Sequence, residues 1–418
     1  MTATLTNNND VKVLRALARQ VAAIAAKPVQ NERRELWRKH NSLERTRPLV
    51  IIGSYMPFFH EVLPWDKLEC SDPSARELEW LLQQLVWRDR LNDDSIIEPF
   101  ITVPPVRASL SGEERWGAPI RFIHSTENRG AGIYAPPIKN EEDIEKLLPQ
   151  PHLIDEAASA ERLRKVQDAI GDIIDVHPDR SPMYSGQGRA DMSTDTARLI
   201  GLEQFMLYMI DRPEWLHRFQ SIVRDGVLRQ HQQAEEAGDW RLFNHHNQAM
   251  CYCRELAGPG EHFNPVQRKD LWTFSASQET TLVSPAMFDE FVLEYQLPII
   301  SRFGLSAYGC CEDLTRKIHL LRKIPNLRRI SVTPWADVAK CAEQIGNNYI
   351  LSWRPSPAEM ICMGFDPERA RRLLREGLNA CKDCHADITL KDVETINGRF
   401  DDLVEWVRIA KEVAEEFA

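Results

Sequence analysis

The alternation of short apolar strands with helices in the second half of the chain constrains the fold most. Several helices are expected to begin at a proline that follows a capping residue, as at Ser284-Pro285, Thr333-Pro334 and Asp366-Pro367. A short apolar run precedes each of the later helices. Strands that alternate with helices in this way are typical of a parallel β/α protein.

The number of strands favours a closed barrel. Counted from Phe100, eight strands are expected, at 100–103, 182–186, 241–244, 271–275, 305–308, 327–332, 349–353 and 386–390. A doubly wound sheet is the alternative, but its first βα turn would be glycine-rich, and Gly186-Gln-Gly188 lies deep in the chain without a third glycine. We therefore expect an N-terminal helical extension over 1–48 and a (β/α)8 TIM barrel over 49–418.

Composition narrows the classes of partner. Acidic residues exceed basic ones, with a net charge of −10, and this balance argues against a nucleic-acid ligand. No apolar run approaches the roughly 18 residues of a membrane span. The cysteines are odd in number and no signal peptide is evident, so we expect reduced thiols in a cytoplasmic protein. The N-terminal helices could form a homodimer interface or a lid.

The active site of a barrel lies at the carboxyl ends of its strands. The densest group expected there is Cys310-Cys311-Glu312, which offers two thiols and a carboxylate to a metal such as Zn²⁺. A second source of ligands is Cys381-Lys-Asp-Cys384-His385, from which Cys384 is the candidate, although this segment precedes its strand. Buried packing is the alternative role of these cysteines.

Other side chains at strand ends could bind or act on a substrate. His245 and His246 point in opposite directions along an extended segment, so one of them, taken as His246, could serve as an acid or base. Arg189 and Arg354 could clamp a carboxylate. We expect catalytic roles for His246, Arg189 and Glu312, and the remaining residues expected to contact a small-molecule substrate are Tyr184, Gln187, Trp272, Tyr308, Trp353 and Arg354.

Three stretches resemble the uroporphyrinogen decarboxylase superfamily, a group of (β/α)8 barrels. Ser185-Gly-Gln-Gly-Arg189 is similar to its glycine-rich strand end, and Ser284-Pro-Ala-Met-Phe-Asp-Glu-Phe-Val-Leu-Glu-Tyr295 is similar to its SPEMFxEF helix. The order of Tyr308-Gly-Cys310, 331–337 and 351–355 follows that of its last strands. The resemblance covers roughly residues 180–415.

Two activities lie within this resemblance. The corrinoid-linked branch implies a methyltransferase that moves a methyl group between a small substrate and a corrinoid protein, with zinc as Lewis acid on Cys310, Cys311, Glu312 and Cys384. Tyr308 stands where the H-x-C motif of that branch has its histidine. The alternative is a cofactor-independent decarboxylase or lyase, but Ser54 replaces the motif arginine that binds carboxylates in true uroporphyrinogen decarboxylases. A non-enzymatic, ligand-binding barrel is a third reading.

Overall fold

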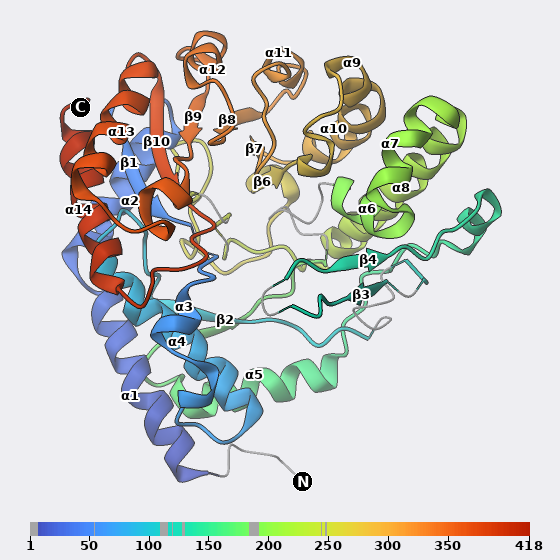
Figure 1. Ribbon diagram of the computed structural model, residues 1–418. Coiled ribbons are helices and arrows are strands. Elements are labelled where there is room, and N and C mark those ends of the chain that lie inside the picture. Colours follow the sequence, from blue (N-terminus) through green and yellow to red (C-terminus); the bar gives the residue numbers. More distant parts are fainter. Residues whose placement is uncertain are drawn as a thin grey trace.

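The computed structural model describes residues 7–53, 55–108, 116–118, 120–127, 130–183, 192–243, 245–246 and 249–418. Its centre is a curled, six-stranded parallel sheet with helices outside it (Figure 1). The strand order is β1-β10-β9-β8-β7-β6. The strands are β1 (Leu49–Ile52), β6 (Trp272–Ser275), β7 (Leu305–Tyr308), β8 (Leu327–Val332), β9 (Ile350–Trp353) and β10 (His385–Leu390).

The expected closed barrel is not what the structure contains. The main sheet is a half-barrel, and β2 (Phe100–Val103) and β5 (Asp175–Pro178) form a separate parallel pair. A third, antiparallel pair joins β3 (Arg121–Ile123) to β4 (Ile133–Ala135). β1, which the count from Phe100 left out, pairs with β10 through Ile52 and Leu390.

Two expected strands have no matching strand in the described residues. β5 forms at 175–178, and of the strand expected at 182–186, residues 182–183 are not in a strand and 184–186 lie outside the described part of the chain. Residues 241–243 are irregular, because the backbone of Trp240 and Leu242 accepts hydrogen bonds from a loop, through the N–H groups of Val266 and Gly260.

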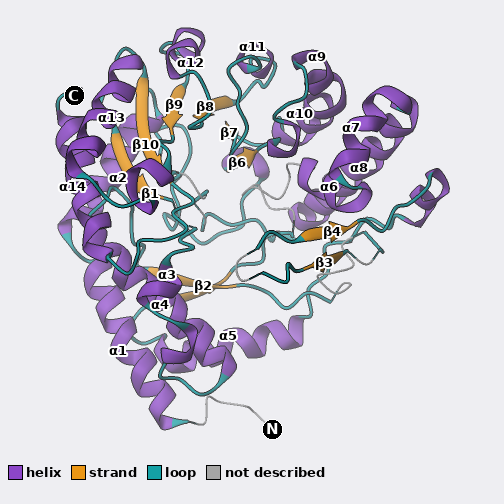
Figure 2. Cartoon of the chain, viewed as in Figure 1, coloured by secondary structure: helices purple, strands orange, loops and turns teal. Residues whose placement is uncertain are grey.

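Helices cover the outer face of the main sheet (Figure 2). Those of the second half are α8 (Pro213–Glu236), α9 (Pro285–Phe288), α10 (Glu294–Ile300), α11 (Ile318–Leu321), α12 (Val338–Ile345), α13 (Pro367–Ala380) and α14 (Phe400–Glu415). Those of the first half are α1 (Asn8–Ala25), α2 (Pro28–Asn41), α3 (Phe59–Val62), α4 (Pro73–Leu91), α5 (Glu156–Ile170), α6 (Ser193–Ile200) and α7 (Leu202–Asp211). Short 3-10 segments are η1 (Trp65–Lys67), η2 (Glu141–Lys146), η3 (Arg268–Asp270) and η4 (Gln278–Thr280), and π-helical turns are η5 (Asp289–Leu293) and η6 (Ala358–Cys362).

The N-terminal helices pack closely on the rest of the chain. α1 shares an apolar cluster with α4, α5, β2 and β5. α2 brings His40 and Asn41 against the inner face of the main sheet, where they contact Asp387 and Arg329. The domain boundary at residue 48 stays a prediction. Within the described ranges, no helix is long and apolar enough to cross a membrane.

The two faces of the main sheet differ in polarity. Side chains alternate along a strand, and on β10 Ala386, Ile388 and Leu390 join the large apolar core beneath the helices. Asp387 on the same strand faces inward and binds Arg329 of β8. A parallel sheet is usually apolar on both faces, so a polar inner face indicates a surface used for chemistry or for binding.

Candidate active site

The carboxyl ends of β7, β9 and β10 meet at one end of the half-barrel. The strand register aligns Tyr308 with Ile330, Val332 with Trp353, and Ile388 with Trp353. The residues that follow these strands therefore lie together, and this region is called the mouth. It contains the turn 309–312 after β7, Arg354 after β9, and Lys391 and Asp392 after β10.

A thiol pair and a lysine form the centre of the mouth. The Sγ atoms of Cys310 and Cys311 are 3.6 Å apart. The Nζ atom of Lys391 lies 3.4 Å from the Sγ of Cys310 and 3.2 Å from that of Cys311. The Lys391 ammonium also forms an ion pair with the carboxylate of Asp392, at 2.8 Å. Cys311 is exposed and Cys310 is half-buried, so an incoming molecule reaches Cys311 first.

The two thiols differ in acidity. The hydrogen bond from the Cys310 thiol lowers the pKa of Cys311 to about 6, with the charge of Lys391 adding to the effect and burial opposing it. The same hydrogen bond, together with burial, raises the pKa of Cys310. Burial works against the Lys391 ammonium, but the thiols and Asp392 outweigh it and raise the pKa of Lys391. The hydrogen bond between the thiols and the charge of Lys391 thus favour a thiolate at Cys311 over one at Cys310.

Arg354 holds the turn that carries the thiols. Its guanidinium is buried and donates to the carbonyl oxygens of Cys310 and Gly309, the latter at 3.4 Å, and to the Oγ of Ser331. Gly309 has a φ of +102°, and a Cβ there would lie 2.7 Å from the Cδ1 of Leu314. Only glycine takes this conformation without strain. The geometry engages Arg354 with the thiol turn, and the contact with a substrate that the sequence suggested for it stays a prediction.

Glu312, expected to be both catalytic and a metal ligand, is a buried clamp. One carboxylate oxygen accepts the backbone N–H of Ser277 at 2.7 Å and the other accepts the N–H of Cys310 at 2.8 Å. Its side chain thus ties the loop after β6 to the thiol turn. Both oxygens therefore accept hydrogen bonds from backbone N–H groups.

The aromatic residues expected to line the mouth lie elsewhere. Tyr308 points outward and donates to the Oε1 of Gln296 on α10 at 2.6 Å. Trp353 points outward against Gly377 of α13, where a Cβ would lie 2.1 Å from the indole. Trp272 begins β6 and packs with Cys251 and Leu305 at the amino end of the sheet. Strand alternation places Tyr308 and Trp353 on the outer face, since Ala307 and Arg354 take the inner one.

Cys384 lies at the opposite end of β10 from Lys391. It precedes the strand, packs in the outer core and lies 3.6 Å from the carbonyl oxygen of Ala342. It therefore does not join Cys310 and Cys311. Within the described part of the chain, no group of three or more His, Cys, Asp or Glu side chains is arranged to hold a metal ion. A zinc site needs at least three protein ligands, so the residues expected to bind zinc do not fit it.

His246 lies buried on the inner side of the sheet. Its ring stacks on Phe274 at 6.0 Å and is tilted against Trp272 at 5.9 Å. Burial, with a smaller contribution from Arg329, lowers its pKa well below the usual value, so the imidazole is neutral. Among the described residues, neither ring nitrogen has a hydrogen-bond partner. Phe274 also belongs to the small apolar cluster against which Cys310 packs, and a catalytic role of His246 stays a prediction.

Deeper in the half-barrel lies a charged network that sequence reasoning missed. Arg329 donates to Asp387 at 2.6 Å, and His40 and Ser352 bind the same carboxylate at 3.0 and 2.8 Å. Burial opposes its ionisation, but the charge of Arg329 and the contacts with His40 and Ser352 together outweigh burial and lower the pKa of Asp387 to about 2. The sequence does contain a signal of this network, since Arg329 and Asp387 are charged residues inside the apolar strands expected at 327–332 and 386–390. Three further predicted site residues, Tyr184, Gln187 and Arg189, lie outside the described residues.

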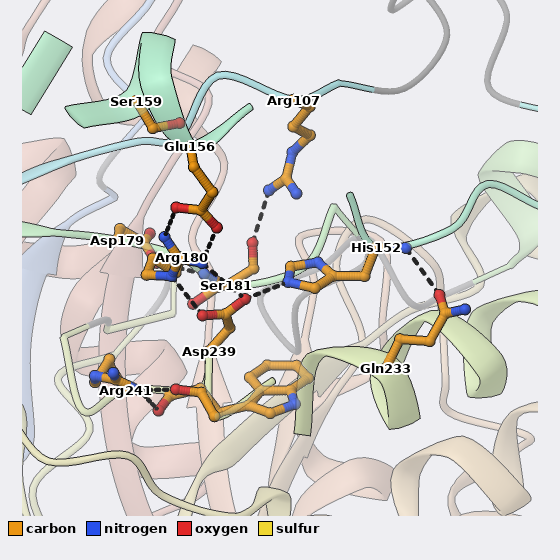
Figure 3. A network of polar contacts seen from close by, with 12 residues as sticks. Arg107, His152, Glu156, Ser159, Asp179, Arg180, Ser181, Gln233, Asp239 and Arg241 are labelled. Carbon is orange, nitrogen blue, oxygen red and sulfur yellow. Dashed lines mark hydrogen bonds and ion pairs between the residues drawn. The ribbon is translucent and has the colours of Figure 1, made fainter. Parts of the chain in front are cut away.

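A second polar network ties α5 and the segment after β5 to the segment that follows α8 (Figure 3). Arg180, after β5, binds both Glu156 of α5 and Asp239, and Asp239 also pairs with the Nε2 of His152 at 2.7 Å. The two carboxylates raise the pKa of Arg180. No member of this set comes from β7, β9 or β10, so the network fastens elements to one another and contributes no group to the mouth.

Comparison with known proteins adds a likeness of fold. No family model matches the sequence, and no curated protein matches it. Among solved structures, the chain is similar to a methyltransferase from Methanosarcina mazei, with 14% sequence identity and a TM-score of 0.53. The alignment covers 92% of this chain and 98% of that one. The two proteins share their overall fold along nearly their whole length.

Proposed function

We propose that this chain is an enzyme that transfers a methyl group, with the Cys311 thiolate as its nucleophile. The contact between Cys311 and Lys391 at the mouth carries the proposal, because it places an exposed thiolate where enzymes of this architecture act. The fold shared with a methyltransferase supports methyl as the group transferred.

The step that follows from this geometry is a displacement at carbon. The sulfur lone pair of Cys311 forms an S–C bond to the methyl group of a small methylated substrate. The bond from that carbon to its heteroatom breaks, and its electron pair leaves with the heteroatom. Lys391, at 3.2 Å from the sulfur, keeps the thiolate charged before the attack and offers a positive charge to the departing anion.

Exposed side chains in the loops around the mouth are the basis for proposing that a partner protein binds there. Four large apolar side chains, called the apolar rim, lie in the loops that follow β1, β6, β8 and β9. Their exposed fractions are 67% for Tyr55, 89% for Leu282, 80% for Trp335 and 76% for Met363. Contiguous exposed apolar surface marks interaction sites, and these four side chains all lie in segments that follow strands of the half-barrel. We propose that the apolar rim seats a corrinoid-carrying protein, whose cofactor supplies a cobalt centre that exchanges methyl groups.

Zinc has no step in this proposal. Of the expected ligands, Cys310 and Cys311 lie together, Glu312 is bound to backbone N–H groups and Cys384 is at the other end of the sheet. The charge that a metal would supply to a thiol is here supplied by Lys391.

The alternative lyase needs cations that anchor a carboxylated substrate. Arg354 has both terminal nitrogens committed to the thiol turn, which leaves Lys391 as the basic group of the mouth within the described residues. Release of CO2 from a carboxylated substrate, retained in Cys311→Ser and lost in Lys391→Met, would favour this alternative over methyl transfer.

The proposal is tested with free methylcobalamin as the methyl source. Absorbance reports loss of its methyl group when the purified full-length chain is added under anaerobic conditions. We expect demethylation by the wild type and by Cys362→Ser, whose half-buried thiol lies in η6 outside the mouth, and none by Cys311→Ser. Equal rates in Cys311→Ser and the wild type would overturn the proposal.

A further inference from the structure

The proposed reaction uses Cys311 and leaves the neighbouring thiol without a chemical task. Cys310 follows Gly309 in the same turn, and its Sγ lies 3.6 Å from that of Cys311. Lys391 contacts both sulfur atoms. The exposed thiol of Cys311 is placed to react with an oxidant first. The half-buried thiol of Cys310 beside it is placed to react with the oxidised sulfur second.

The other thiols of the chain lack this arrangement. Cys70, Cys251, Cys253, Cys341, Cys381 and Cys384 are buried, and burial raises the pKa of Cys251 to about 12 and that of Cys341 to about 11. Buried thiols of this kind react poorly, because the thiolate is the nucleophile. Cys362 is half-buried like Cys310, and it therefore serves as a matched control.

We propose that Cys310 and Cys311 form a redox modification site, in which a hydroperoxide converts the pair reversibly into a disulfide between adjacent residues. The inference rests on the proposed function, because oxidation of the pair would block the sulfur of Cys311 that the proposed reaction uses. Exposure places Cys311 as the thiol that meets the oxidant, and the 3.6 Å separation places Cys310 as the thiol that resolves it.

The chemistry balances in two steps. The Cys311 thiolate attacks one oxygen of the hydroperoxide, the O–O bond breaks, and a sulfenic acid and an alkoxide or hydroxide result. Cys310 gives its proton to that base, and its sulfur attacks the Cys311 sulfur. The S–S bond forms as the S–O bond breaks and hydroxide leaves, taking up a proton to become water. The two thiols lose two electrons, which reduce the peroxide.

A disulfide between two adjacent residues is easily reduced. The peptide bond fixes neighbouring Cα atoms about 3.8 Å apart, whereas disulfides ordinarily join Cα atoms roughly 4.4–6.8 Å apart. A bridge between adjacent residues is therefore strained, and strained disulfides are the more readily reduced. Lys391 loses its thiolate partner in the oxidised form and keeps its ion pair with Asp392, so oxidation removes the nucleophile of the mouth.

Mass spectrometry of the full-length protein tests the inference. After brief exposure to equimolar hydrogen peroxide, we expect the peptide that contains Cys310 and Cys311 to lose two hydrogen atoms and to regain them with dithiothreitol. Cys310→Ser should instead accumulate a sulfenic acid at Cys311, trapped by dimedone, and Cys362→Ser should behave as the wild type.

Two results would overturn it. One is oxygen retained on Cys311 in the wild type while Cys310 stays a free thiol. The other is a disulfide that joins either cysteine to a different one. Because the readout is the oxidation state, a disulfide that forms in a protein unable to demethylate methylcobalamin would refute the proposed function alone, and methyl transfer without a disulfide would refute this inference alone.

Discussion

At the scale of single residues, Lys391 adds to the effect of the Cys310 thiol in favouring a thiolate at Cys311. Its ammonium lies 3.2 Å from Cys311 and contributes to the pKa of about 6 at that thiol. Removing the cation in Lys391→Met should raise the pKa of Cys311 towards the ordinary value of about 8.5. The rate of alkylation by iodoacetamide as a function of pH measures this shift.

Lys391→Arg is the matched control, because it keeps the charge at the same position. Its alkylation profile should stay close to that of the wild type. A Lys391→Met profile with the same midpoint as the wild type would mean that the lysine does not stabilise the thiolate.

His246 should make the fold sensitive to acid. Its pKa in the folded chain is far below that of an unfolded histidine, so the unfolded state takes up the extra proton as the pH falls through about 6.5. The contribution of the neutral His246 ring to the free energy of unfolding is therefore fully present above that pH. Below it, this contribution falls by up to about 1.4 kcal/mol per pH unit. His246→Phe keeps an aromatic ring on Phe274 and removes the titration.

Urea unfolding of the wild type and of His246→Phe at pH 7 and pH 5 measures this contribution. His40, His177 and His385 also have lowered pKa values through burial, and they remain in both proteins. The wild type should therefore lose more stability between the two pH values than the variant. Equal losses would contradict a buried neutral His246.

At the scale of elements, the sequence predicts the second half of the sheet better than the first. Strands 305–308 and 327–332 match the structure, because each is a short apolar run bounded by turn or helix signals. β1 was overlooked as a member of the sheet, since its pairing with β10 joins residues far apart in the sequence. Residues 241–243 of the strand expected at 241–244 are irregular, because a loop donates hydrogen bonds to this backbone.

The site was predicted in part for the same reason. Placement of Cys310, Cys311, Arg354 and Lys391 at strand ends follows from the strand positions, and the structure brings these residues together. The direction of a side chain at a strand end depends on alternation within strands of four residues, so a shift of one residue reverses it. That sensitivity explains why the sequence did not predict that Tyr308 and Trp353 point outward and that Arg354 holds the turn.

Arg329 of β8 and Asp387 of β10 form an ion pair across the intervening strand β9. Both side chains are buried, with exposed fractions of 2% and 0%. Arg329→Met should destabilise the fold by about 3–5 kcal/mol, because it leaves the buried Asp387 charge with only His40 and Ser352 as partners. Urea unfolding measures the loss.

The double variant Arg329→Met/Asp387→Leu removes both charges and should recover much of that stability. If the double variant is as unstable as the sum of the two single variants, the pair does not act as a unit.

At the scale of the whole molecule, the half-barrel separates the expected zinc ligands. Cys384 lies at the amino end of β10 and the thiol pair lies beyond its carboxyl end, while Glu312 faces backbone donors. We expect zinc well below one ion per chain in protein purified without chelators, as measured by inductively coupled plasma mass spectrometry. One zinc per chain, lost in Cys310→Ser, would contradict this description of the mouth.

The location of the transferred methyl group tests the central claim most directly. After incubation with methylcobalamin that carries a deuterated methyl group, the protein is digested and its cysteine peptides are sequenced by mass spectrometry. The account predicts the label on the sulfur of Cys311, with Cys310 and Cys362 unlabelled. Label on another residue, or demethylation of the cofactor with no label on Cys311 at any time, would contradict it.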